Sequence, residues 1–456
     1  MLQLVPLLSW FVCGCLADLR PIIRICVHLK LNQNTIETPT TTRAPWYYLL
    51  LLILAGEAVF ILPFVLPRIF RPTVLDVFAL DNVELGLCFS VYGILAIPSY
   101  LFGGPLADKY PPRKLIAVAL WLTALGGVLY AQYPDATVLR ILYGYWGVTT
   151  IFLFWAPMIK AARVWGGANA QGKAYGFLDG GRGLTGALFG LLGVLIFSFF
   201  LTEAADVASL SERKRAFSYI IYTSSGIISI IGVLVWYFMT TKNEAQGNLE
   251  QITLAEIRQV LKLPSVWLLM VIILSAYVGY KITDIISQYA EEVMLYDQVE
   301  AAKTGTLLQF LRPTTGILVG LIADRYRITR LLFFGFVLAV VAGLLFATGI
   351  IAPTTTILFF LSVVVIGVAV YACRALYFGV MQVGKIPLAL TGTAVGLISL
   401  TGYTPDIFAG PAYGYLLDAH TGQEIGHQHV FLMFTAFSLI GGIAAFSYDR
   451  KYGKAE

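Results

Sequence analysis

The sequence predicts an all-α integral membrane protein made of two related halves. The first observation is composition: the 456-residue chain is 58% hydrophobic and only 12% charged, whereas a soluble chain carries roughly a quarter charged residues. The second is an internal repeat, because residues 103–114 and 319–330 are similar and each lies between two long apolar runs. The net charge of +5 therefore gives no indication of nucleic-acid binding, since the basic residues lie in loops between apolar runs.

The two copies of the repeat align over a glycine, an alanine, an aspartate, a tyrosine and two basic positions. In the order of the chain, the matched pairs are Gly104 with Gly320, Ala107 with Ala323, Asp108 with Asp324, Lys109 with Arg325, Tyr110 with Tyr326 and Lys114 with Arg330. The same register continues into the next apolar run, where Gly127 matches Gly343. This pattern indicates an internal duplication of a membrane unit.

Twelve apolar segments are long enough to span a bilayer. They are residues 46–66, 85–104, 115–133, 138–158, 174–200, 217–239, 264–290, 304–323, 331–351, 356–381, 391–416 and 429–447. Each is expected to be a helix, because an isolated strand would leave its backbone polar groups unpaired in lipid.

The remaining stretches divide the chain into domains. We expect an extension over residues 1–45, with an apolar start too short for a comfortable span and then a Thr-rich linker. A first six-helix unit then covers residues 46–239, and a second covers 264–447. Between them, residues 240–263 are polar and are expected to form a short amphipathic linker, and residues 448–456 form a tail.

Basic residues predict the orientation. If the amino terminus is cytoplasmic, sixteen lysines and arginines fall on that side and six on the other. The six are Arg68, Arg71, Arg213, Lys214, Arg215 and Lys303. We therefore expect both termini to be cytoplasmic, with the protein in the cell membrane.

The repeated pattern Gly-x-x-Ala-Asp-basic-Tyr, placed after the second span of each half, resembles the major facilitator superfamily. The resemblance covers residues 46–447 and implies two pseudo-symmetric six-helix bundles around a central cavity that opens alternately to each side. Drug antiporters of that superfamily carry a Gly-Pro pair in the fifth helix, and the run GFLDGGRGLTGALFGLLG lacks the proline. Residues 391–418 loosely resemble the sugar-phosphate-permease and organic-anion branches.

The repeated loops are expected to form a cytoplasmic gate. Its residues are Asp108, Arg113, Lys114, Asp324, Arg325 and Arg330. Ion pairs between them would hold the two halves together when the cavity faces outward and would separate when it faces inward. The alternative is that they are ordinary cytoplasmic anchors, although this does not explain an aspartate in both copies.

Glu57 is the first charged residue that the prediction places inside the membrane. It lies about 18 Å along the first span at the helical rise per residue, and a buried charge needs a partner or a function there. A proton-coupling site is one interpretation, and a structural carboxylate bonded to a neighbouring helix is the other.

Arg312 in the eighth segment is predicted at a similar depth, with Gln309 one turn away and Pro313 beside it. A guanidinium stays charged and binds carboxylates or phosphates through two hydrogen bonds. We therefore expect Arg312 and Gln309 to contact substrate; a permanent ion pair with Glu57 or another acid is the alternative.

Three further residues complete the predicted substrate site. Tyr280 and Lys281 lie in the seventh segment, where Asp284 is close enough to neutralise Lys281. Arg374 lies in the tenth segment, with tyrosines one turn to either side. In the fifth segment, the glycine-rich run is expected to be a helix-packing face.

No cofactor motif or metal site is evident, and no enzymatic activity is expected. The five cysteines have no regular spacing. His420 and His427 precede the last apolar segment, and His429 is its first residue. All three are expected to lie in a solvated loop before the last helix, and the membrane segments are otherwise expected to contain no histidine.

These features predict a secondary transporter of a small organic anion, a carboxylate or phosphorylated compound, taken up with protons by alternating access. An exchanger or exporter on the same scaffold, or a membrane receptor that binds without transport, are the alternatives. The expected partners are the small-molecule substrate, a proton or another coupling ion and the lipid bilayer, and we expect a monomer that binds no nucleic acid.

Overall fold

The computed structural model describes residues 45–166, 171–201, 208–239, 254–323, 325–377, 379–384, 386 and 391–453. Every regular element in these ranges is a helix, which confirms the all-α prediction. The predicted extension, the first part of the linker and Asp324 lie outside the described residues, as does the side chain of Asp108.

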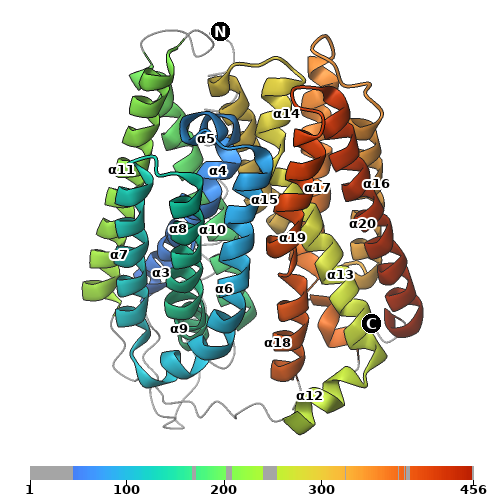
Figure 1. The fold of residues 1–456 in the computed structure, drawn as a ribbon. Coiled ribbons are helices and arrows are strands. Elements are labelled where there is room, and N and C mark those ends of the chain that lie inside the picture. Colours follow the sequence, from blue (N-terminus) through green and yellow to red (C-terminus); the bar gives the residue numbers. More distant parts are fainter. Residues whose placement is uncertain are drawn as a thin grey trace, which may run out of the picture. The chain divides into compact units, whose positions relative to one another are not determined.

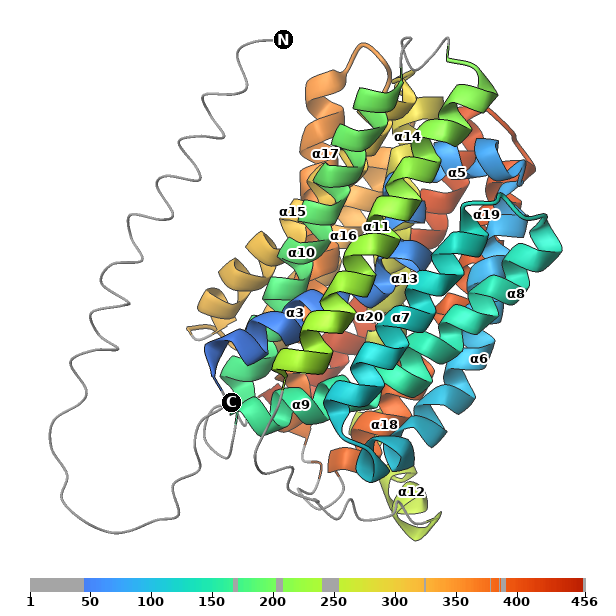
Figure 2. The ribbon, with the colours of Figure 1, turned by 90° about the vertical axis from the view of Figure 1, so that its left-hand side faces the viewer.

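The first half contains six membrane-crossing units. They are coloured from blue to green in Figure 1, and Figure 2 turns this half toward the viewer. In chain order its elements are α3 (Trp46–Phe60), η1 (Ile61–Val65), α4 (Leu66–Ile69), α5 (Arg71–Phe78), α6 (Asn82–Lys109), α7 (Pro112–Tyr130), α8 (Ala136–Gly147), η2 (Val148–Trp155), α9 (Ala156–Gly166), α10 (Gln171–Phe200) and α11 (Leu210–Phe238). The short helix α5 covers one end of the half, which we call the α5 end.

The second half repeats this arrangement after the linker helix α12 (Leu254–Leu261). Its elements are α13 (Pro264–Lys281), η3 (Ile282–Asp284), α14 (Ile286–Glu292), α15 (Gln298–Ala323), α16 (Ile328–Ala347), α17 (Thr356–Leu376), η4 (Gly379–Gly384), α18 (Thr391–Gly402), α19 (Pro405–Asp418) and α20 (Glu424–Tyr452). Helix α14 lies at the α5 end and α12 at the opposite end, the α12 end (Figure 1).

Eleven of the twelve predicted spans are single stretches long and apolar enough to cross a membrane, counted over the described residues. The remaining predicted span, residues 391–416, is divided into α18 and α19. Pro405 causes the break, because proline has no N–H to continue the helical ladder and its ring disfavours a helical conformation in the residue before it. Tyr403 and Thr404 form the turn that joins the two helices.

The first span runs further than its apolar pattern indicates. It continues as a π-helix through η1 and ends at Ile69. Arg68 was therefore assigned wrongly to an outer loop: it lies in the last turn of the span and is only 2% exposed. Ion pairing, described below, makes this burial possible, whereas hydropathy counts a charged residue as the end of a span.

The two halves meet along two pairs of helices. Helix α6 packs on α19, and α10 packs on α15. At the α5 end, side chains of one half bond to side chains of the other. The bonds are Arg68 Nε to Asp284 at 2.6 Å, Arg71 Nε to Gln288 at 2.7 Å, Thr73 to Gln298 at 2.9 Å, and Asn82 Nδ2 to Asp418 at 2.9 Å. We call this set the α5-end seal.

Glycines let α6 and α19 approach closely within this seal. A Cβ atom at Gly86 would lie 2.5 Å from the backbone carbon of Gly410. Farther along α6, a Cβ atom at Gly104 would meet nothing within 4 Å. Gly86 is thus tightly packed against α19, whereas Gly104 of the same helix has room for a side chain.

Gly86→Ala is expected to destabilise the protein, because backbone atoms must move to admit the new methyl group, at a cost of about 1–3 kcal/mol. Gly104→Ala is the matched control, and it should leave the melting temperature in detergent unchanged or raise it slightly, since alanine favours helix over glycine. Equal melting temperatures for the two variants would contradict the close contact.

The gate residues that the structure describes with their side chains, Arg113, Lys114, Arg325 and Arg330, lie at the α12 end. Among those described, Arg113 donates to the carbonyl of Trp236 in its own half at 3.5 Å, and Arg330 lies 3.9 Å from Asp449 in its own half. If the gate residues of the two halves separate when the α5 end is closed, each would contact its own half in this way. The gating role stays a prediction, because the side chains of both repeated aspartates lie outside the description.

The expectation of a solvated histidine loop is wrong for His427 and His429, and so is the expectation that the membrane segments contain no histidine. His420 lies in the turn before α20. Helix α20 begins at Glu424, so His427 and His429 belong to the last span. His427 is fully buried, and its Nε2 lies 2.8 Å from Glu292 Oε2 in α14. The carboxylate partner makes burial of this histidine possible, and it comes from a segment distant in the sequence.

A second acid of α14 predicts how stability depends on pH. Burial, together with the nearby charges of Asp76 and Glu292, raises the pKa of Glu291 to about 7. The folded protein therefore binds this proton more tightly than the unfolded chain, so the contribution of Glu291 to stability falls as pH rises from about 4.5 to about 7.

Replacing Glu291 by glutamine should remove that fall. The melting temperature of Glu291→Gln, relative to the parent, is expected to increase as the pH is raised through this window. A constant difference in melting temperature between the two proteins across this pH window would show that burial does not raise the pKa of Glu291.

Candidate functional site

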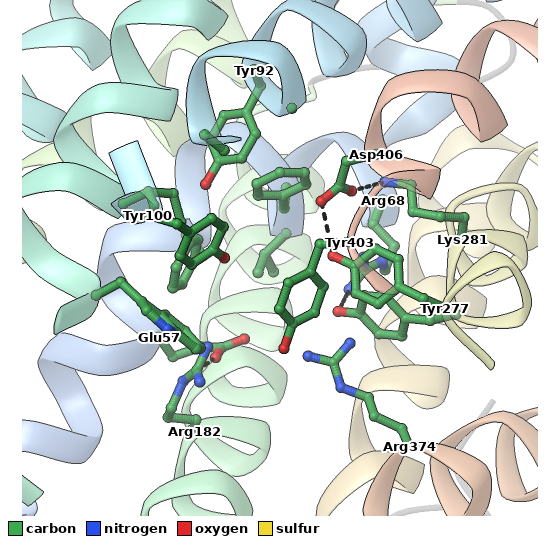
Figure 3. Close-up of a pocket in the computed structure, with 18 of the residues that line it drawn as sticks. Glu57, Arg68, Tyr92, Tyr100, Arg182, Tyr277, Lys281, Arg374, Tyr403 and Asp406 are labelled. Atoms are coloured by element: carbon green, nitrogen blue, oxygen red, sulfur yellow. Dashed lines mark hydrogen bonds and ion pairs between the residues drawn. The ribbon is translucent and has the colours of Figure 1, made fainter. Parts of the chain in front are cut away.

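A cavity lies between the two halves, below the α5-end seal (Figure 3). It contains about 880 Å³ of empty space, including the part open to solvent. Its lining residues are Glu57, Phe60, Phe64, Val65, Arg68, Tyr92, Gly93, Ala96, Ile97, Tyr100, Ile151, Trp155, Arg182, Tyr277, Tyr280, Lys281, Arg312, Arg374, Leu400, Tyr403 and Asp406.

The structure brings most of the predicted site residues together. Arg312, Lys281, Tyr280 and Arg374 line the cavity, and so does Glu57. Gln309 does not belong to the lining: it is buried within the protein, on the same helix as Arg312. The prediction of one shared site therefore agrees with the geometry for these lining residues, while their roles in binding stay predictions.

Glu57 lies between two arginines. Its Oε1 is 3.1 Å from Arg312 Nη1 across the two halves, and its Oε2 is 3.2 Å from Arg182 Nε within the first half. Arg312 also contacts Asp179, with Nη2 3.2 Å from Oδ1. These four residues, the central ion cluster, balance two positive and two negative charges.

Close helix packing positions this cluster. A Cβ atom at Gly186 of α10 would lie 3.0 Å from Glu57 Oε1, and one at Gly183 would lie 3.1 Å from the ring of Pro313. The glycine-rich run thus provides a face against which α3 and α15 pack, as the sequence predicts.

A second cluster lies nearer the α5 end. Asp284 accepts from Arg68 Nε at 2.6 Å and lies 2.8 Å from Lys281 Nζ. The same ammonium group is 3.5 Å from Asp406 Oδ1. Arg68, Lys281, Asp284 and Asp406, the upper ion cluster, also balance two positive and two negative charges.

Arg374 is the cavity cation that neither cluster neutralises. Among the described residues, no carboxylate lies within ion-pair distance of its guanidinium, and its Nη1 is buried without a hydrogen-bond partner. Its guanidinium lies over the ring of Tyr280, with Cζ 3.9 Å from the ring centre. The aromatic face thus supports the cation while the edge of the guanidinium points into the cavity (Figure 3).

Tyrosines form the wall beside Arg374. Tyr403 stacks on Tyr100 of the other half at 6.0 Å between ring centres and contacts Tyr277 edge to face at 5.0 Å. Figure 3 shows the hydroxyl end of Tyr403 near the guanidinium of Arg374. The site therefore combines apolar ring surface with hydroxyl groups that can donate or accept.

The charges around the cavity leave a positive excess. Its lining contains five cations, Arg68, Arg182, Lys281, Arg312 and Arg374, whereas the carboxylates that line it or pair with these cations, over the residues described, are Glu57, Asp179, Asp284 and Asp406. With all of them ionised, one positive charge remains.

Sequence reasoning missed Arg68, Arg182, Asp406 and the aromatic wall as members of the site. Asp179 and Arg182 are three residues apart in α10, but each pairs with a residue of another helix. Asp406 could have been found from one signal, because a carboxylate beside a proline in the middle of an apolar segment marks a break in a membrane helix.

Comparison with known proteins supports the architecture. Residues 47–409 match the model of the Major Facilitator Superfamily. The chain is 27% identical over 415 residues to "Inner membrane protein YqcE" of Escherichia coli (strain K12), covering 88% of this chain and 94% of that protein. It is 24% identical over 418 residues to "Inner membrane protein YihN" of the same organism, covering 89% and 95%.

Solved transporters share the fold. A bacterial homolog of the human lysosomal transporter Spinster, in an inward-facing and occupied conformation, superposes with a TM-score of 0.71 at 15% identity, covering 91% of this chain and 98% of that one. The nucleoside transporter NupG superposes with a TM-score of 0.68 at 16% identity, covering 89% and 99%. At these identities the likeness concerns the fold alone.

Proposed function

Because the chain belongs to the Major Facilitator Superfamily, a superfamily of integral membrane transporters, we propose that it carries a small organic anion across the membrane by alternating access. The observation that supports an anion is Arg374, the buried guanidinium that no described carboxylate neutralises. A carboxylate or phosphorylated compound bound there would satisfy both its charge and its free N–H groups.

The other predicted arginine has a different role in this proposal. Arg312 already forms ion pairs with Glu57 and Asp179, which is the alternative that the sequence left open. Its donors would have to leave these partners before they could bind a substrate, and removing a buried ion from its partners is costly. We therefore propose that Arg374 binds the anion and that the central ion cluster joins the two halves.

The aromatic wall supports a substrate with an organic body. Tyr100, Tyr277 and Tyr403 offer ring faces and hydroxyl groups beside Arg374. A sugar-like or short carbon chain that carries one acidic group would use both features. Inorganic ions would leave the ring surface unused.

We propose that the α12 end is cytoplasmic, on the basis of the excess of basic residues predicted there. The α5-end seal closes the other side, so the cavity would open toward the cytoplasm. The names of the two relatives from Escherichia coli, both called inner membrane proteins, support a location in the cell membrane. We propose uptake with protons, and exchange or export would use the same site.

A ligand screen tests the proposal. Bound ligand stabilises the native state by mass action, so gluconate, lactate or glucose 6-phosphate should raise the melting temperature of the purified protein in detergent. Glucose and choline, which lack an acidic group, should not raise it. Stabilisation by choline or glucose alone would overturn the proposed substrate class.

A further inference from the structure

The upper ion cluster connects the cavity to the α5-end seal. We propose that Asp406 is a proton-binding site and that its protonation weakens the seal through Lys281 and Asp284. The inference rests on the proposed transport function, and it identifies a carboxylate different from Glu57 as the coupling group.

Asp406 makes a longer ion-pair contact than Glu57 and Asp284, which each lie within 3.2 Å of two cations. Tyr277 donates to its Oδ2 at 3.0 Å, and its Oδ1 has no hydrogen bond and lies 3.5 Å from Lys281 Nζ. The carboxylate lines the cavity near the break between α18 and α19, although the residue is only 7% exposed. The exposed part of the side chain lets the carboxylate exchange a proton with water in the cavity.

The groups that face Asp406 belong to three elements of the fold. Tyr277 and Lys281 belong to α13, and Asp284 follows them in η3. On the other side, Tyr92 of α6 lines the same part of the cavity (Figure 3). Lys281 is the one of these groups that carries a positive charge, so its position depends on whether Asp406 is ionised.

Protonation of Asp406 leaves no buried cation without a partner. Lys281 is only 2% exposed, but its ammonium group already lies 2.8 Å from Asp284 and would keep that ion pair. Protonation of Glu57 has the opposite consequence: Arg182 would lose its ion pair, and no second one is found for it among the described residues. Leaving a buried charge unpaired is strongly unfavourable.

Asp284 transmits the change to the seal. Its Oδ1 accepts from Arg68 of the first half at 2.6 Å, and its Oδ2 contacts Lys281. While Asp406 is ionised, Lys281 is shared between two carboxylates. Once Asp406 is neutral, Lys281 is attracted to Asp284 alone. Lys281 then competes with Arg68 for the negative charge of Asp284, which weakens the ion pair between Arg68 and Asp284 that joins the two halves.

The opening of the α5 end can be measured directly. Thr137 at the start of α8 and Thr354 just before α17 are exposed at that end, one in each half. Nitroxide labels on Thr137→Cys and Thr354→Cys, in a background whose native cysteines are replaced by alanine, report the separation by pulsed electron resonance. The full chain is studied in lipid nanodiscs without any added organic anion.

In the parent, the population with a long separation is expected to grow as the pH of the sample is lowered, because protonation of Asp406 weakens the seal. Asp406→Asn imitates the protonated carboxyl group and should show the large long-distance population at every pH. Asp406→Glu keeps a titratable group and should keep a pH response, which guards against loss of folding in the asparagine variant.

A control separates this site from an acid of α14 at the α5 end. Glu291→Gln should keep the response of the parent. A response that persists in Asp406→Asn, or that disappears in Glu291→Gln instead, would overturn the proposal. Because no organic anion is present, either result is independent of whether Arg374 binds one.

Discussion

Replacing Arg374 by alanine is expected to abolish anion transport. The guanidinium is the buried cation that no described carboxylate neutralises, so it can bind an anion without first losing a partner. Hydrogen bonds to charged groups contribute about 1.5–3 kcal/mol each, so losing a bidentate pair should weaken binding on the order of 100-fold or more. Titration of the purified variant with the anion found to stabilise the parent measures this loss.

Two matched substitutions make the result specific. Arg374→Lys keeps the charge but cannot bind through a planar pair of donors, so we expect intermediate affinity. Arg140→Ala removes a half-exposed arginine that lies 3.5 Å from Glu84, away from the cavity lining, and should bind as the parent does. Parent-like affinity in Arg374→Ala would assign the anion to another residue.

Arg312→Ala is expected to destabilise the whole protein. Arg312 is 6% exposed and joins Glu57 and Asp179 of the first half to α15 of the second. Removing one partner of a buried ion pair typically costs about 3–5 kcal/mol. The melting temperature in detergent should therefore fall markedly, even without ligand.

The control for this prediction is Arg330→Ala, which removes an exposed arginine at the start of α16 and should leave the melting temperature nearly unchanged. The double variant Glu57→Gln with Arg312→Gln removes both charges of one ion pair. Its loss of stability should be smaller than the sum of the losses in the two single variants. If Arg312→Ala melts at the temperature of the parent but loses anion binding, the central ion cluster is part of the substrate site.

The sequence predicts the fold well because lipid leaves few alternatives. Long apolar runs must be helical in a bilayer, and the duplicated loops indicate two related halves. The ends of the spans were less accurate, since hydropathy treats a charged residue as a boundary. Arg68 and His427 show why this fails: each is buried by a carboxylate partner in the other half or in a distant helix.

The sequence identified several residues that line the candidate site better than it identified the ion pairs that they form. Mid-membrane charges such as Glu57, Lys281 and Arg312 could be identified individually, because charges are costly there. Their partners were predicted directly only for Lys281 with Asp284, which are three residues apart on one helical stretch. The pair of Glu57 with Arg312 was only an alternative. Glu57 and Arg312 are 255 residues apart, and only the packing of the two halves brings them together.

The same limit applies to Arg374. Its position in an apolar segment marked it as a candidate, but the sequence could not distinguish it from Arg312. The difference is that Arg312 has two carboxylate partners and Arg374 has none among the described residues. Such a distinction depends on contacts between segments far apart in the chain, which the folded protein alone reveals.

Uptake by proteoliposomes tests the central claim most directly. Parent, Arg374→Ala and Arg140→Ala proteins would be reconstituted in parallel and supplied with labelled gluconate, lactate, glucose 6-phosphate, glucose or choline, with and without a proton gradient. The account predicts that at least one acidic compound enters vesicles that contain the parent or Arg140→Ala protein, and that this uptake is lost with Arg374→Ala. Uptake of only glucose or choline, or equal anion uptake by all three proteins, would contradict it.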